Sequence, residues 1–273
     1  PQTQEDNILQ RLTVIRNTYP SDVDHDVMEL LMQSVEKEAA LALQPYGYFF
    51  PTIKVTNSAS MDSWAVHVNI DHGKPLKIDR SEIIITGDGK DNEAIKKAVA
   101  NASVQVGDTF TVPGYNRAQK NIFTAARNSG YIQTQLIKHE TQISLTNNEA
   151  VVFLTFDTGP RYYFGPITFS KTPYSTTFLR RFINFKEGTP YSPQKLEKLQ
   201  TDLMGSKYFN NVLMQPNINK AQDEQVPLTI KTEAVKSQQY NLGLGYGTNT
   251  GARTSIGMDF YRLTDTGQHL STL

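Results

Sequence analysis

The strongest constraint on the fold is an order of segments (strand, helix, helix, strand, strand) that occurs twice in the chain. The first copy opens with the apolar strand 82–86, which the turn-forming residues 87–89 close. Two strands, at 132–143 and 150–156, end this copy. Such an order predicts an α+β module in which two helices cover one face of a small sheet.

Two predicted helices fill the middle of this copy. We expect Asp91 to cap the first helix, in which Ile95, Val99 and Ala102 recur at the spacing of one buried face. In segment 111–113 a threonine stands two positions before a proline, which is the usual order of a cap and an early proline. This segment therefore predicts the start of the second helix.

The second copy runs from 163 to 230 and keeps the same register. In the first copy, Gly107 lies four residues before the capping Thr111. In the second copy, Gly188 lies four residues before Ser192, which precedes a proline. The loop and the cap therefore coincide, and the two modules are expected to share one architecture.

A third and less complete copy precedes them. Residues 8–15 and 27–39 have helical apolar spacing, and strands are expected at 49–55 and 64–70. The Gly-Tyr pair that closes its second helix recurs in the middle copy at an offset of 83 residues. The opening strand is missing, so either residues upstream of Pro1 supply it or this module is open on one side.

The last part of the chain has a different periodicity. In 240–247 three large apolar side chains point one way while glycines and an asparagine point the other, and 255–260 repeats this alternation. Such strands suit the lipid-facing wall of a barrel, which needs about 9–11 residues per strand. An ordinary soluble hairpin is the other interpretation, and the position behind three modules favours the barrel.

The sequence therefore predicts an α+β chain of three tandem β-α-α-β-β modules followed by the first strands of a transmembrane β-barrel. We expect the modules at 1–75, 76–160 and 161–235, and the barrel strands at 236–273.

Composition excludes several classes of function. The 27 basic and 27 acidic residues balance, so no positive field favours nucleic acid. Cysteine is absent, which excludes a disulfide framework, a thiolate metal site and a cysteine nucleophile. No run of about 18 apolar residues suggests a membrane helix.

No motif points to catalysis. The five histidines are His25, His67, His72, His139 and His269, and none lies four residues from another or in a zinc-binding helix motif. Residues 87–90 lack the length of a phosphate-binding loop and are expected to form a tight turn. We therefore expect no enzyme, no bound metal and no cofactor.

Two surface features have alternative interpretations. The aromatic run 162–164 is expected in a core at a module junction, with an exposed client-binding patch as the alternative. Arg180, Arg181 and Lys186 could touch lipid head groups, although a solvated helix face is the simpler interpretation.

Three stretches carry a family resemblance. They read FDTGPRYYFGPI from Phe156, FKEGTPYS from Phe185 and LGLGYGTNTGAR from Leu242. Together with three β-α-α-β-β units, these stretches resemble the POTRA modules and the barrel start of the TamA family of BamA-like outer-membrane proteins. BamA has five such modules and two-partner secretion transporters have two, so the count of three favours the TamA family.

The resemblance implies a non-enzymatic assembly factor of the outer membrane, with residues 1–235 in the periplasm. Its expected partners are a TamB-like protein anchored in the inner membrane, nascent outer-membrane proteins such as autotransporters, and outer-membrane lipid around the barrel. Two alternatives stay open: the POTRA arm of a two-partner secretion transporter, and that of a barrel-linked phospholipase.

The edges of the predicted sheets are the candidate binding sites, because unpaired backbone groups there can pair with an extended client. The candidate edge residues are Tyr131, Gln133 and Gln135 in the second module, and Phe209, Val212 and Met214 in the third. Leu242, Leu244 and Tyr246 mark a candidate seam that glycines weaken and that could open laterally. Relief of crowding in a curved barrel is the alternative role of those glycines.

Overall fold

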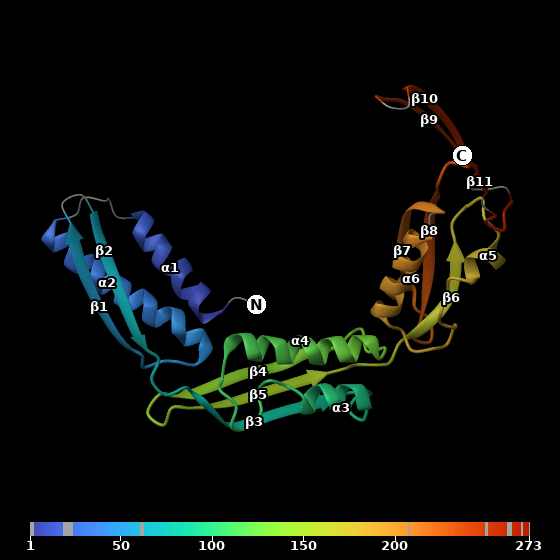
Figure 1. Ribbon diagram of the computed structural model, residues 1–273. Coiled ribbons are helices and arrows are strands. Elements are labelled where there is room, and N and C mark those ends of the chain that lie inside the picture. Colours follow the sequence, from blue (N-terminus) through green and yellow to red (C-terminus); the bar gives the residue numbers. More distant parts are fainter. Residues whose placement is uncertain are drawn as a thin grey trace. The chain divides into compact units, whose positions relative to one another are not determined.

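The computed structural model describes residues 3–18, 24–60, 63–206, 208–248, 251–260, 264–268 and 270–272. The fold is α+β (Figure 1). The chain forms two compact units, one of Pro1–Ala125 with Gln135–Asp157 and one of Ala126–Thr134 with Thr158–Leu273. We call the element sets α1 to β2, β3 to β5 and β6 to β8 the first, second and third modules.

The first module holds two helices and a hairpin. Its elements are α1 (Gln4–Thr18), α2 (His25–Leu43), the 3-10 turn η1 (Gln44–Tyr46), β1 (Thr52–Ser60) and β2 (Ser63–Asp71). The two strands are antiparallel and form a two-stranded sheet. One core cluster consists of Ile15, Met28, Leu31 and Val35, with Val55, Val66 and Val68 packed against it. The helices therefore cover one face of the hairpin.

The second module has the predicted order of elements. They are β3 (Lys77–Thr86), α3 (Glu93–Ala100), α4 (Val112–Asn128), β4 (Gln135–Ser144) and β5 (Glu149–Asp157). The sheet order is β3-β5-β4, with β3 parallel and β4 antiparallel to the central β5. Along β5, every second residue is buried. Helix α4 packs on this face, where Phe123 meets Phe156 with ring centroids 5.2 Å apart.

Two details of this module differ from the prediction. Strand β3 begins at Lys77, five residues earlier than expected, because a single apolar residue, the buried Ile78, stands among polar residues in its first half and gives only a weak signal. The cap of α3 is Asn92 rather than Asp91, since the Asn92 side chain accepts from the amides of Ala94 and Ile95. The second helix does begin after Thr111, whose hydroxyl accepts from the Gly114 amide at 3.0 Å.

The third module repeats this arrangement. Its elements are β6 (Tyr163–Phe169), α5 (Thr176–Arg180), α6 (Pro193–Gly205), β7 (Phe209–Pro216), the 3-10 turn η2 (Ile218–Lys220) and β8 (Gln225–Ala234). The sheet order is β6-β8-β7, again with the first strand parallel to the central one. Leu196, Leu199 and Leu203 of α6 are buried, as their spacing predicted.

The predicted coincidence of loops in the two modules is confirmed at the level of hydrogen bonds. The Gly107 amide donates to the carbonyl of Ile78 at 2.8 Å, and the Gly188 amide donates to that of Phe164 at 2.7 Å. Both glycines have positive φ, +88° and +79°. The glycine turn therefore returns the chain to the opening strand in the same way twice.

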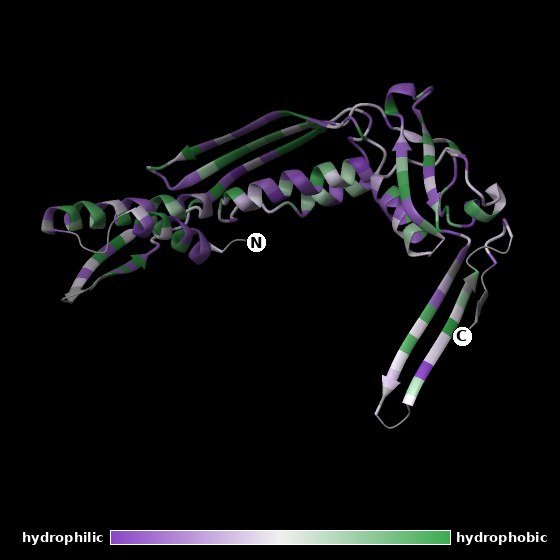
Figure 2. Ribbon diagram, turned by 90° about the horizontal axis from the view of Figure 1, so that it is seen from above, coloured by the Kyte–Doolittle hydropathy of each residue, from purple (hydrophilic) through white to green (hydrophobic). Residues whose placement is uncertain are grey.

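The C-terminal segment forms a separate three-stranded antiparallel sheet. It consists of β9 (Gln238–Gly247), β10 (Gly251–Phe260) and β11 (Leu270–Thr272), in the order β11-β10-β9. Hydrophobic residues alternate with others along the hairpin of β9 and β10 (Figure 2). Among the described residues, no helix combines the length and the apolarity needed to cross a membrane.

Candidate docking edges and exposed faces

Strand β7 is an edge of the third sheet, as predicted for Phe209 to Gln215. One side of β7 pairs with β8, and no strand of the described chain pairs with the other. The side chains of Phe209 and Val212 are buried and that of Met214 is half-buried, so these three fix the strand to the core. Leu213 is 48% exposed and is the large apolar side chain that this edge presents to solvent.

Two features limit pairing along β7. The register shifts between Phe209 and Asn211, and an irregularity of this kind interrupts an edge. The Val212 carbonyl also accepts from the Gln200 side chain of α6 at 2.8 Å. The part of β7 best suited to a partner strand is therefore its second half, from Leu213 to Pro216.

Strand β4 is the corresponding edge of the second sheet, but it begins later than predicted. Its first residue is Gln135. Tyr131 and Gln133 belong to the preceding turn, in which the Tyr131 amide donates to Ala126 at 3.0 Å. Tyr131 is only 4% exposed. The expectation that Tyr131 and Gln133 lie on the edge strand is wrong, because the glycine that ends α4 leads into a turn before the strand.

The first module leaves open a sheet edge that the opening strand occupies in each of the other two modules. In those modules the opening strand lies parallel to the last strand, β3 on β5 and β6 on β8. The last strand of the first module is β2, which pairs with β1 on one side and with no described strand on the other. This arrangement agrees with the expected lack of an opening strand in residues 1–75.

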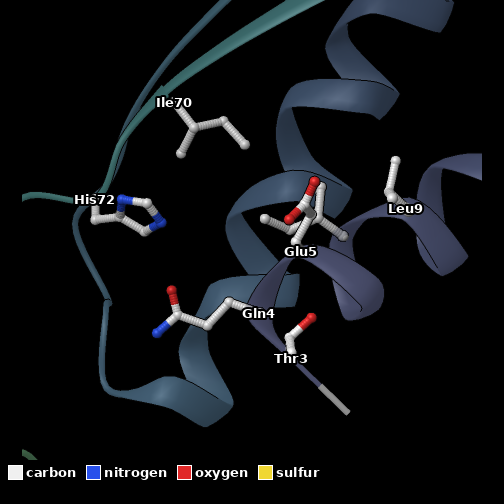
Figure 3. Close-up of a pocket in the computed structure, with 7 residues that line it drawn as sticks. Thr3, Gln4, Glu5, Leu9, Ile70 and His72 are labelled. Carbon is white, nitrogen blue, oxygen red and sulfur yellow. The ribbon is translucent and has the colours of Figure 1, made fainter.

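A pocket of about 640 Å³ opens beside the end of β2. Its lining residues, drawn in Figure 3, are Thr3, Gln4, Glu5, Ile8 and Leu9 at the start of α1, with Ile70 and His72 on the other side. Sequence reasoning did not find this pocket, because residues far apart in the chain line it.

Within the aromatic run 162–164, Phe164 belongs to the core of the third module and Tyr162 packs against that core while partly buried. Phe164 is fully buried and stacks on Phe185 with ring centroids 4.0 Å apart. Tyr191 lies 5.0 Å from Phe164 by the same measure, and burial raises the pKa of its phenol. The core interpretation of Phe164 is therefore correct. Arg180, Arg181 and Lys186 are exposed on the module surface.

The segments considered for phosphate and metal binding can be located in the structure. The segment 87–90 is a tight turn, with the Lys90 amide donating to the Gly87 carbonyl at 3.3 Å. Within the described residues, no three His, Asp or Glu side chains gather as metal ligands would. The side chain of His25 and the whole of His269 lie outside that description.

The C-terminal hairpin carries an uncovered apolar face. The candidate seam residues Leu242, Leu244 and Tyr246 are 80%, 87% and 82% exposed. Ile256, 72% exposed, stands directly opposite Leu242 in the register of β9 and β10. Gly243 faces Ser255 on the other side of the hairpin, where side chains are small. A two-stranded surface of this kind in water is a liability unless lipid or protein covers it.

Comparisons with known proteins identify the first and the third module. Residues 1–72 match the family model described as POTRA domain TamA domain 1, and residues 162–234 match the model described as POTRA, surface antigen variable number repeat. The chain therefore contains POTRA domains, and its predicted fold class is confirmed for the modules.

The chain is also similar to parts of two BamA proteins. Outer membrane protein assembly factor BamA of Buchnera aphidicola is 27% identical over 132 residues, which are 48% of this chain and 21% of that protein. The crystal structure of BamA from Haemophilus ducreyi lacking POTRA domains 1–3 superposes with a TM-score of 0.59 at 20% identity, covering 71% of this chain and 36% of that one. The chain thus spans about a fifth of the length of that curated relative.

Proposed function

We propose, from the POTRA domains in this chain and its relation to BamA proteins, that it is the periplasmic arm of an outer-membrane assembly factor, with residues 1–235 in the periplasm and 236–273 entering the membrane. Three modules, at 1–75, 76–160 and 161–235, form the arm. The matches of residues 1–72 and 162–234 to POTRA models support the first and the third of these boundaries.

The proposal rests on the order in which two kinds of surface, open sheet edges and an exposed apolar face, follow each other along the chain. Open sheet edges occur in the modules, and a hairpin with an uncovered apolar face follows them. An extended segment can pair with an open edge through backbone hydrogen bonds, which tolerates many client sequences. The apolar face of β9 and β10 suits lipid, as in the wall of a transmembrane barrel.

We further propose that the protein acts as members of the TamA family do. In that role it takes a TamB-like partner through the first module and passes nascent outer-membrane proteins to a seam at Leu242, Leu244 and Tyr246. The match of residues 1–72 to a TamA domain model supports this assignment. The open edge of β2 is a candidate binding site for the TamB-like partner. The end of β7 is a candidate binding site for a nascent outer-membrane protein.

A two-partner secretion transporter is the second candidate. Such a transporter would carry two modules, so it requires residues 1–75 not to form one. The match of residues 1–72 to a POTRA model counts against that requirement. In the phospholipase alternative, the modules are a regulatory appendage and another region of the protein carries the chemistry.

The docking role can be tested by site-specific photo-crosslinking in cells. A photoreactive residue replaces Leu213, 48% exposed on β7, and in a matched control replaces Met204, 47% exposed on α6 of the same module. We expect nascent outer-membrane proteins to be captured from position 213 several times more often, because only that position lies on an open edge. Equal capture at the two positions would refute docking at β7.

A further inference from the structure

The turn between β10 and β11 bonds to the third module at two points. The Ser175 amide donates to the Asp265 carbonyl at 3.0 Å, and the Tyr208 hydroxyl donates to the Gly267 carbonyl at 2.9 Å. Ser175 is the cap of α5, and Tyr208 immediately precedes β7. The turn 264–268 therefore contacts both a helix start and the start of the edge strand.

An aromatic cluster of Tyr174, Phe178, Tyr208 and Phe209 receives this turn. The Phe178 and Tyr208 rings are perpendicular, with centroids 5.1 Å apart, and Tyr174 lies 5.3 Å from Phe178. Gly267 is buried against this cluster, and a Cβ built on it would lie 2.5 Å from two ring carbons of Phe178. Its φ of +76° also favours glycine. The cluster accepts a glycine turn and leaves no room for a larger residue.

Tyr208 makes hydrogen bonds at two points where the third module meets the C-terminal segment. Its carbonyl accepts from the Val235 amide at 2.9 Å, just before the chain enters β9, and its hydroxyl binds the returning turn. A single covalent connection would leave the sheet free to rotate about the chain. A second attachment to the same residue restricts that rotation.

We propose that the turn 264–268 and the aromatic cluster form a latch that holds the C-terminal sheet to the third module. Tyr208 and Gly267 are its positioning residues. Because Tyr208 leads directly into β7, the latch sets the start of that edge strand relative to the sheet. This inference rests on intrachain contacts alone and stands whether or not β7 binds clients.

The first test uses the absence of cysteine from the chain. Cysteines introduced by Ser175→Cys and Asp265→Cys would stand at positions joined by a backbone hydrogen bond, close enough for a disulfide. We expect this pair to cross-link rapidly on mild oxidation of the full chain in detergent, as a shift in gel mobility. The control pair of Ser175→Cys with Ser255→Cys, exposed on β10, should cross-link slowly. Equal rates for the two pairs would overturn the latch.

The second test adds substitutions to the first cysteine pair. Gly267→Ala places a methyl against Phe178, whereas Gly251→Ala has a similar φ of +72° and meets nothing within 4 Å. We expect Gly267→Ala to slow cross-linking and Gly251→Ala to leave it unchanged. Tyr208→Phe removes one hydrogen bond while keeping the ring, so it should slow cross-linking by about fivefold even where Gly267→Ala fails to fold. An unchanged rate in Tyr208→Phe would contradict the proposal.

Discussion

At the scale of single residues, two glycines perform the same task at successive module ends. The Gly47 carbonyl accepts from the Leu76 amide at 2.7 Å, and the Gly130 carbonyl accepts from the Tyr162 amide at 2.8 Å. Both have positive φ, +88° and +101°. A Cβ on Gly130 would lie 2.6 Å from the Tyr162 carbonyl oxygen. Glycine lets the helix end turn and lets the following linker approach closely.

We expect Gly130→Ala to destabilise the second compact unit more than Gly188→Ala does. Both positions have positive φ, which costs alanine about 1–2 kcal/mol. Only Gly130 has a backbone atom in the way, since nothing lies within 4 Å of a Cβ at Gly188. The close contact should add roughly 1 kcal/mol or more.

Urea titration monitored by hydrogen exchange of peptides from residues 158–234 measures this difference. Equal losses of unfolding free energy in the two variants would show that the Tyr162 carbonyl oxygen does not clash with a side chain at position 130.

At this scale, the sequence predicts the structure best where few residue types can adopt the required backbone conformation. The offset between Gly47 and Gly130 indicated a shared helix end, because few residues other than glycine adopt that backbone readily. The prediction of Asp91 as the cap was wrong, since Asp and Asn both cap helices and only the exact start of α3 identifies Asn92. Tyr131 was misplaced because an aromatic residue after a glycine fits a turn as well as a strand.

At the scale of elements, helix α6 takes its cap from another helix. Ser192 occupies the cap position but makes no capping bond to the helix. The Asn128 side chain, at the end of α4, instead accepts from the Gln194 amide and from the Ser192 hydroxyl, each at 3.3 Å. Arg161 adds a bond to the Ser129 carbonyl at 2.9 Å. The end of α4 is thereby tied to the start of α6 within the second compact unit.

We expect Asn128→Ala to increase hydrogen exchange in the first turn of α6. Loss of a capping side chain typically costs about 0.5–2 kcal/mol. Gln194→Ala is the matched control, because it keeps the amide that Asn128 caps and changes only an exposed side chain. Mass-spectrometric exchange of peptides covering 193–205 measures the effect. Unchanged exchange in Asn128→Ala would mean that this cap contributes nothing to α6.

The accuracy with which whole helices and strands were located depended on how regularly their apolar residues recur. Helix α6 and strand β5 were located correctly, since their buried residues recur at regular spacing. Strand β3 was predicted too short, because Asp79 and Arg80 at the sheet edge are polar. The identity of β7 as an edge was predicted from the repeat, but the hydrogen bond that blocks part of it involves Gln200, which no local pattern indicates.

At the scale of the whole molecule, the order of helices and strands in two stretches of the chain was apparent in the sequence because that order repeats internally. The latch and the pocket beside β2 were not, since each brings together residues with no common motif. We propose that modules in the periplasm continue into strands in the outer membrane. This proposal depends on what covers the apolar face of β9 and β10.

Cysteine labelling in outer membranes can distinguish lipid from water around this face, because the chain has no cysteine of its own. Leu244→Cys lies on the apolar face, 87% exposed in the isolated chain, and Leu213→Cys lies on the third module. We predict that a membrane-impermeant maleimide modifies position 213 once the periplasm is opened and leaves position 244 unmodified until detergent removes the lipid. Modification of position 244 without detergent, as fast as that of position 213, would show that lipid does not cover this face.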